Sequence, residues 1–328
     1  MDETKGRRPT IRDVARTADV SVGTVSRVLN QHPNVHDRTR RRVLETMRTM
    51  GYEPVFAAQE LGRGTRPTIG LSTGLGTRRL VPFFQVFHER LTESAANDGF
   101  RFIEIPTGPD GMPEYLVDAM VLFGTHDDDA RIQYLQQQDV PFAVIGHHPD
   151  CFSVASDDYD GGRIAAEHLL RLGHRTFWVL TGGLNGQASR DRLRGSADAL
   201  SAAGITEVDR EVLDADLTPL GGYRAVAAAL ASQSAPSAII AATDELAIGA
   251  WAALEDHGVG VPGDVSIVGF DDLPEIGERL STVHQSFDTL ADTTIRLLRR
   301  AMNAEPPQQV LLPVRLVTRE TTRRRDFP

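Results

Sequence analysis

The sequence has very little cysteine and lysine, and it has no long hydrophobic run. Its one cysteine, Cys151, excludes a disulfide within the chain and a zinc site built from cysteines. No apolar run approaches the roughly 20 residues that a membrane-spanning helix needs, and residues 1–8 contain no apolar stretch typical of a secretory signal. The chain has 328 residues, 41% of them hydrophobic, which is enough to bury a large core. These features predict a soluble, cytoplasmic protein of more than one domain, with no membrane association.

Positive charge is scarce overall but concentrated at one end of the chain. Residues 1–66 carry 13 basic residues, including the only lysine, against 8 acidic ones, a net charge of +5. The whole chain has a net charge of −10, so residues 67–328 carry −15. A basic segment on an acidic body is typical of a chain in which one part binds a polyanion. The charge alone also fits a solvated helix, because residues 38–42 include four arginines.

Three short helices are predicted in the first fifty residues. Thr10 is a good N-cap, and apolar positions 11, 14, 15 and 18 lie on one face of the helix that follows. Ser21 caps a second helix, which ends near Asn30. A third begins at Asp37, with apolar positions 43, 44, 47 and 50 facing inward, and stops at Gly51. Two short helices joined by a turn and braced by a third form a helix-turn-helix, although a packing module without a DNA role has the same pattern.

In a helix-turn-helix the second helix enters the major groove, and its N-terminal residues face the base edges. Here these residues are Val22, Gly23 and Thr24, followed by Ser26 and Arg27. Val22 and Gly23 have no side chain that can form hydrogen bonds. Direct readout is therefore expected from the other three, with arginine to guanine as the expected bidentate contact.

The same region resembles the DNA-binding domain of the lactose- and purine-repressor (LacI/GalR) family. The similar stretches are residues 10–15 (TIRDVA), 20–30 (VSVGTVSRVLN), 39–43 (TRRRV) and 51–54 (GYEP). The resemblance implies a bacterial transcriptional regulator that binds double-stranded operator DNA. The DNA contacts expected from the residues and the resemblance are Thr10, Ser21, Val22, Gly23, Thr24, Ser26, Arg27, Asn30, Ala58 and Leu61.

Residues 54–66 read as a linker with a short helix over 55–61, followed by Gly62 and Gly64. A helix of under two turns is not stable alone in water, so it is expected to form only when something holds it. The resemblance implies a hinge helix that forms on the operator, with Leu61 wedged between base pairs in the minor groove. Simple packing of Leu61 is the alternative.

Beyond residue 67, short apolar runs alternate with amphipathic stretches of helix length. The runs are 69–71, 100–105, 120–123, 142–145, 177–180, 238–241 and 265–268, and the helices are 83–97, 161–172, 190–203, 223–231, 245–257 and 290–302. This alternation predicts an α/β fold with buried parallel sheets. Residues 106–117 are few for a crossover, so its helix is expected to be cut to about one turn around Glu114.

Ligands of open α/β sheets bind beyond the carboxyl ends of the strands. This rule selects Gly146, His147, Thr181, Gly182, Thr243, Asp244, Asp271 and Asp272.

The family resemblance extends over the body, which it describes as a two-lobed domain similar to periplasmic sugar-binding proteins, with an effector in the cleft. By position, Arg192 and Asp271 fall on the family's effector-binding arginine and aspartate, and Phe83 and Phe84 fall on its first-lobe aromatics. An arginine fork and an aspartate suit the hydroxyls of a sugar or related polyol. A plain salt bridge between Arg192 and Asp271 is the alternative.

Two positions depart from the family pattern. Many relatives have an aspartate where this chain has Gly146, so His147 or His148 is expected to take that polar role. Leu217 stands where sugar- and purine-binding relatives place a stacking aromatic ring. The expected effector contacts are Phe83, Phe84, His147, Arg192, Leu217, Thr243 and Asp271.

Metal and catalytic sites have little support in the sequence. His32 and His36 lie four apart, but Pro33 between them breaks the helical face that a zinc pair needs. Residues 127–129 lack the glycine and distant glutamate of a calcium loop. No Ser/His/Asp or Cys/His arrangement has local support. The sequence therefore predicts no metal, no cofactor and no catalytic residue.

Taken together, these features predict an N-terminal all-α helix-turn-helix domain (residues 1–53), a hinge (54–66) and an α/β two-lobed periplasmic-binding-protein-like domain (67–328). The predicted function is a DNA-binding transcriptional repressor that binds a palindromic operator as a homodimer and responds to a small-molecule effector. Two other classes remain possible from the residues: a small-molecule binding protein without DNA function, and an α/β enzyme.

Overall fold

The structure is a computed structural model that describes residues 11–29, 35–50, 66–74, 82–126, 128–184, 186–274, 276 and 278–325. The chain divides into two compact units, and it passes between them repeatedly. The first unit contains residues 1–77, 91–153 and 292–309, and the second contains residues 78–90, 154–291 and 310–328. In the part of the chain that is described, no helix has the length and hydrophobicity required to span a membrane.

The helix-turn-helix predicted from the sequence is present as α1 (Ile11–Thr17), α2 (Val22–Leu29) and α3 (Asp37–Met50). Its core contains Val14, Val25, Val43 and Met47, all buried. The prediction that Leu44 faces inward is wrong, because its side chain is 48% exposed. One residue turns an α-helix by about 100°, so burying positions 43 and 47 points position 44 away from the core.

The first sheet has the strand order β11-β5-β4-β3-β1-β2. Its strands are β1 (Thr68–Thr73), β2 (Arg101–Ile105), β3 (Ala119–Phe123), β4 (Phe142–Ile145), β5 (Ser153–Ser156) and β11 (Gln309–Leu312). The central strand β1 is buried throughout and pairs in parallel with β2 and β3, with Ile69 opposite Phe102 and Ala119. Helices α5 (Pro82–Asn97) and α6 (Ala130–Gln137) follow β1 and β3 along the chain.

The connection between β2 and β3 differs from the prediction. No helical turn forms around Glu114. Instead the chain folds back on itself, with an isolated bridge between Thr107 and Pro113 and a hydrogen bond of 2.8 Å from Gly108 N to Met112 O. Proline cannot donate to a helical ladder, and Gly111 has a φ of +79°, so this segment makes a tight turn in place of a helix.

The second sheet has the strand order β12-β10-β9-β8-β6-β7. Its strands are β6 (Phe177–Thr181), β7 (Arg210–Asp214), β8 (Ala238–Ala241), β9 (Ser266–Asp271), β10 (Ser281–His284) and β12 (Arg315–Val317). The five strands β10, β9, β8, β6 and β7 pair in parallel with their neighbours in this order, and the edge strand β12 pairs antiparallel with β10. Helix α7 (Asp158–Arg171) follows β5 and leads into β6, and the helices that follow β6, β7, β8 and β10 are α8 (Gln187–Ala202), α9 (Pro219–Leu230), α10 (Asp244–Asp256) and α11 (Phe287–Met302).

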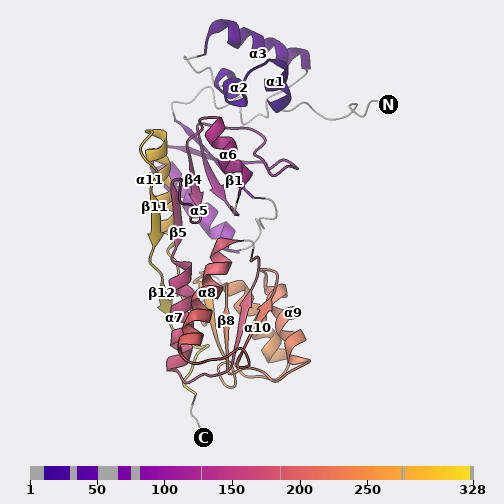
Figure 1. The fold of residues 1–328 in the computed structure, drawn as a ribbon, viewed down its shortest axis with the longest axis vertical. Helices are drawn as coiled ribbons and strands as arrows, with labels where there is room; N and C mark the ends of the chain where they lie inside the picture. Colours follow the sequence, from indigo (N-terminus) through magenta and orange to yellow (C-terminus); the bar gives the residue numbers. More distant parts are fainter. Residues whose placement is uncertain are drawn as a thin grey trace, which may run out of the picture. The chain divides into compact units, whose positions relative to one another are not determined.

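Helices cover both faces of the second sheet, with α7 and α8 on one side and α9 and α10 on the other (Figure 1). Alternate residues of β6 show why. Trp178 and Leu180 pack into the cluster with α9 and α10, and Phe177 and Val179 pack into the cluster with α7 and α8. Successive side chains of a strand point to opposite faces. A strand buried on both faces therefore reads as a continuous apolar run, which is the pattern that the sequence shows.

Candidate functional site

The N-terminus of α2 is fixed by its capping residue. The backbone N–H of Thr24 donates to Ser21 Oγ at 3.0 Å, and the hydroxyls of Ser21 and Thr24 lie 2.9 Å apart. The prediction that Ser21 caps this helix is confirmed. Such a cap satisfies a backbone donor that the helix leaves open and sets where the helix begins.

Of the side chains expected to face DNA, Arg27 is exposed and Thr24 is half-buried. Val22 packs against the helix-turn-helix core, so its role is partly structural. Gly23 is the second residue of α2. Thr10, Asn30, Ala58 and Leu61, and the side chain of Ser26, lie outside the described residues, as does the predicted hinge helix.

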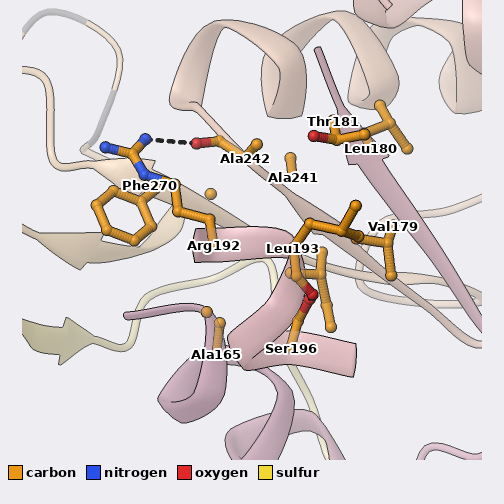
Figure 2. Close-up of a pocket in the computed structure, with 13 residues that line it drawn as sticks. Ala165, Val179, Leu180, Thr181, Arg192, Leu193, Ser196, Ala241, Ala242 and Phe270 are labelled. Carbon is orange, nitrogen blue, oxygen red and sulfur yellow. Dashed lines mark hydrogen bonds between the residues drawn. The ribbon is translucent and has the colours of Figure 1, made fainter. Parts of the chain in front are cut away.

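A second polar group of residues lies at the carboxyl ends of the strands of the second sheet. Arg192 on α8 is its centre. The Nε–H of Arg192 donates to Asp158 Oδ1 at 2.7 Å, and its Nη1 donates to Ala242 O at 2.6 Å and to Asp271 Oδ1 at 3.3 Å. Figure 2 shows the hydrogen bond to Ala242. Arg192 and Asp271 thus form an ion pair, as both the effector-site prediction and its salt-bridge alternative require, and their part in effector binding remains a prediction.

The pocket drawn in Figure 2 lies beside Arg192, Phe270 and the apolar side chains of Val179 and Leu193. Its volume is about 10 Å³. A cavity of this size has room for about one water molecule. An effector the size of a sugar therefore does not enter it, and the pocket belongs to the packing beneath Arg192.

Asp271 is the last residue of β9 and is 1% exposed. Its Oδ1 accepts a hydrogen bond from Gln285 Nε2 at 2.5 Å as well as the one from Arg192. Its Oδ2 has no hydrogen-bond partner among the described residues. The φ of Asp271 is +111°, a conformation that side chains other than glycine rarely adopt and that is found preferentially at functional sites. Burial raises the pKa of Asp271 well above its usual range, while Arg192 lowers it and Glu245 and Asp244 raise it further.

The neighbouring carboxylates of α10 have different surroundings. Asp244 is fully buried, and both oxygens are satisfied, by Leu273 N at 2.9 Å and Thr282 Oγ1 at 2.6 Å. Burial raises the pKa of Asp244 to about 7. Glu245 is 2% exposed; its Oε1 accepts a long hydrogen bond of 3.5 Å from Phe83 N, and its Oε2 has no partner among the described residues. Asp244 therefore fastens α10 to the strand ends, whereas Glu245 keeps one acceptor open.

Two other expected effector residues of the second unit have structural contacts. Thr243 is the N-cap of α10, and its Oγ1 accepts from Leu246 N at 3.2 Å. Leu217 packs against the α9–α10 cluster and lies close to Gly182 and Gly183. If Thr243 also contacts an effector, it does so in addition to capping α10, and Leu217 would do so in addition to its packing role.

The expected aromatic and histidine contacts also have structural surroundings. The ring of Phe83 lies 5.3 Å from that of Phe287, between centroids. Phe84 is 3% exposed and packs beside His88, so its ring is mostly covered. His147 is exposed and belongs to the first unit, unlike Arg192 and Asp271. Their roles toward an effector stay predictions.

Several polar residues of this site were not predicted from the sequence. Asp158 follows β5, and Gln285 follows β10; Ser156 Oγ donates to Gln285 Oε1 at 2.6 Å. Glu245 adjoins a residue that the strand-end rule selected. The same rule would have found Asp158 and Gln285 if β5 and β10 had been recognised as strands. In the described part of the chain, no group of three His, Cys, Asp or Glu residues is placed to hold a metal ion.

A capped helix-turn-helix ahead of two mostly parallel sheets, with a buried Arg–Asp pair at the strand ends of one, is the arrangement expected of a DNA-binding regulator with a ligand-binding body. Comparison with known families gives the same result. Residues 10–55 match the model of bacterial regulatory proteins of the lacI family, and residues 166–322 match the periplasmic binding protein-like domain. The predicted fold class is confirmed.

Similar proteins cover nearly the whole chain. The HTH-type transcriptional repressor PurR of Klebsiella pneumoniae (strain 342) is 30% identical over 331 residues, which span 95% of this chain and 96% of the relative. A transcriptional regulator CelR–cellobiose complex aligns with a TM-score of 0.70 and 28% identity, covering 96% of this chain and all of the other. The lac repressor dimer bound to operator and the anti-inducer ONPF aligns with a TM-score of 0.70 and 27% identity, over 97% of this chain and all of the other. The chain belongs to the lacI family of bacterial regulatory proteins and is a DNA-binding transcriptional repressor of that family.

Proposed function

We propose that this repressor acts in the cytoplasm, associated with the nucleoid, as a homodimer that binds a near-palindromic operator and is controlled by a small-molecule effector, a sugar or related polyol. The observation that carries the DNA half is α2, a helix with a fixed N-terminus and an exposed arginine, Arg27, one turn into it. A dimer presents two such helices to two half-sites about one helical turn apart. Residues 1–53 would read the half-site, and residues 54–66 would act as the hinge.

The effector half of the proposal rests on Arg192 and Asp271. Arg192 is held by Asp158, Ala242 and Asp271, while Asp271 Oδ2 has no hydrogen-bond partner among the described residues and would accept a donor from a ligand. Arginine donors and aspartate oxygens suit the hydroxyls of a polyol. The similarity to a regulator bound to cellobiose supports this class of ligand. The effector controls operator binding only if it binds two conformations of the protein with different affinity.

The proposal is tested by selecting bound fragments from a random duplex library with the purified protein at physiological salt, since the salt concentration sets the background of nonspecific binding. We expect an enriched inverted repeat with a central pyrimidine–purine step, and we expect Leu61→Ala to abolish the enrichment because such a step yields to a side-chain wedge. Weak, salt-sensitive binding without enrichment, also in the presence of small molecules from a cell extract, would overturn the proposal and favour a binding protein without DNA function.

A further inference from the structure

We propose that the effector of this chain is a cationic polyol, such as an amino sugar, whose protonated amine lies against the open carboxylate oxygens of Glu245 and Asp271. The inference rests on the proposed function, since it concerns the ligand of the same site.

The first observation is that two buried acceptors are open. Glu245 is 2% exposed and Asp271 is 1% exposed, yet Glu245 Oε2 and Asp271 Oδ2 have no hydrogen-bond partner among the described residues. Buried polar atoms are rarely left without a partner, because an unsatisfied atom costs free energy. The free oxygen of Glu245 accepts hydrogen bonds, as does that of Asp271 when its carboxyl is ionised, so the partner that the two call for is a hydrogen-bond donor.

The second observation is the balance of charge. The site holds the carboxyl groups of Asp158, Asp244, Glu245 and Asp271, and in the described part of the chain the guanidinium of Arg192 is the only cation in salt-bridge contact with them. Arg192 is shared by Asp158 and Asp271. Glu245 has the backbone N–H of Phe83 at the start of α5, and it is itself in the first turn of α10. The two helix N-termini stabilise its charge, but neither supplies a counter-ion.

These observations distinguish three kinds of ligand. A phosphorylated or carboxylated sugar would place another negative charge beside Glu245, where it is opposed by poorly solvated carboxylates. A hydroxyl supplies one hydrogen and no charge. An ammonium group supplies three N–H donors and the missing positive charge, and charge-assisted hydrogen bonds are stronger than neutral ones. The site therefore favours an amine over its hydroxyl analogue.

The test uses the full-length protein and matched sugars. Glucosamine, galactosamine and mannosamine are each compared by calorimetry with the parent sugar, the N-acetyl derivative and the 6-phosphate. The N-acetyl compound keeps the nitrogen but removes its charge, so it separates charge from shape. We expect at least one amine to bind about tenfold more tightly than its parent, as a charged donor exceeds a neutral one.

The variant Glu245→Gln keeps the shape of the side chain and removes its charge. It should lower the affinity for the amine about tenfold more than it lowers the affinity for the parent sugar, so that the preference for the amine is lost. The matched control is Glu320→Gln, which removes a charge from an exposed side chain of the same unit, paired with Arg279. It should leave the preference intact. Melting temperature and operator binding show whether each variant is folded, and the comparison of ligands on the unmodified protein does not depend on them.

The inference is overturned if no amine binds, or if the parent, N-acetyl or phosphorylated member equals the amine in every series. If an inverted repeat is still selected under that result, the proposed repressor stands and only the class of effector is wrong. If no operator is selected, the proposed function fails on its own test, whatever the sugars show.

Discussion

The guanidinium carbon of Arg192 lies 3.5 Å from the centroid of the Phe270 ring, so the cation is stacked on this ring. The next residue in the chain, Asp271, accepts a hydrogen bond from the same guanidinium. Consecutive residues at the end of β9 thus supply an aromatic face and, through Asp271, an anionic acceptor to the same side chain. A planar guanidinium is suited to both contacts at once, since it stacks on a ring and donates within its own plane. The position and orientation of Arg192 are therefore fixed before any ligand binds.

This relationship predicts that Arg192→Lys both destabilises the second unit and abolishes the response of operator binding to the effector. Lysine keeps the positive charge but loses the planar fork, so the contacts to Asp158, Ala242 and Asp271 cannot all be kept. We expect the free energy of unfolding in urea to fall by about 1–3 kcal/mol and operator binding to lose its response to effector. The matched control is Arg194→Lys on the same helix, whose side chain is 64% exposed. It should change stability by less than about 0.5 kcal/mol. A full effector response in Arg192→Lys would contradict the assigned role.

A close approach of α7 and α8 predicts that Gly162→Ala destabilises the second unit. A Cβ at Gly162 would lie 2.0 Å from the backbone oxygen of Arg192, so one helix backbone would have to move. Overpacking of this kind costs about 1–3 kcal/mol, and a shift of α8 would also move Arg192. The control is Gly263→Ala, where the nearest atom to an added Cβ is 3.7 Å away. Thermal unfolding of both variants checks the prediction, and equal melting temperatures would show that the helices can separate at little cost.

The exposed position of Arg27 on α2 predicts that it reads a base. Loss of a bidentate arginine–guanine contact should cost about 1–3 kcal/mol and relax specificity at one base position. We would measure Arg27→Ala against the selected operator and single-base variants of each half-site. Equal weakening on all sequences, together with a smaller salt dependence, would identify Arg27 as a phosphate contact instead.

The sequence predicts those elements whose hydrophobic pattern is set by burial on their own faces. Strands such as β1 and β6 are buried on both faces and appear as continuous apolar runs, so all seven predicted runs are strands. The strands β5, β10, β11 and β12 are short and mix polar with apolar residues, and β7 is mostly polar. Such strands are stabilised by pairing with neighbours distant in sequence, which a local pattern does not show.

The candidate site, like the fold, was predictable only in part. Arg192 and Asp271 could be placed together from the family resemblance, and Asp271 also from the strand-end rule. Asp158 and Gln285 depend on β5 and β10, which the pattern does not reveal. The open oxygen of Glu245 depends on which donors surround it in three dimensions, and no property of residues 244–246 alone determines this.

The last prediction concerns His174, which is 3% exposed and has its Nε2 3.2 Å from the backbone oxygen of Arg323. A carbonyl oxygen only accepts, so Nε2 carries the hydrogen, and Nδ1 has no partner among the described residues. Burial lowers the pKa of His174 to about 4, helped by the nearby Arg325, His168 and Arg175 and opposed by the hydrogen bond to the Arg323 backbone, which raises it. The folded protein therefore favours the neutral imidazole.

A folded-state pKa below the unfolded value of about 6.5 means that the unfolded chain binds the extra proton first. The contribution of His174 to stability is therefore complete above pH 6.5 and is lost as the pH falls from 6.5 to 4. We expect His174→Gln, whose amide can still donate to Arg323 O, to remove this part of the pH dependence. The difference in unfolding free energy between the parent and the variant should then shrink as the pH falls over that window. His147→Gln, at an exposed position, is the matched control and should leave the slope as it is. A parallel pH profile for the parent and His174→Gln would mean that the imidazole is solvated or partnered in the folded protein, and an NMR titration of the ring would then place its pKa near the unfolded value.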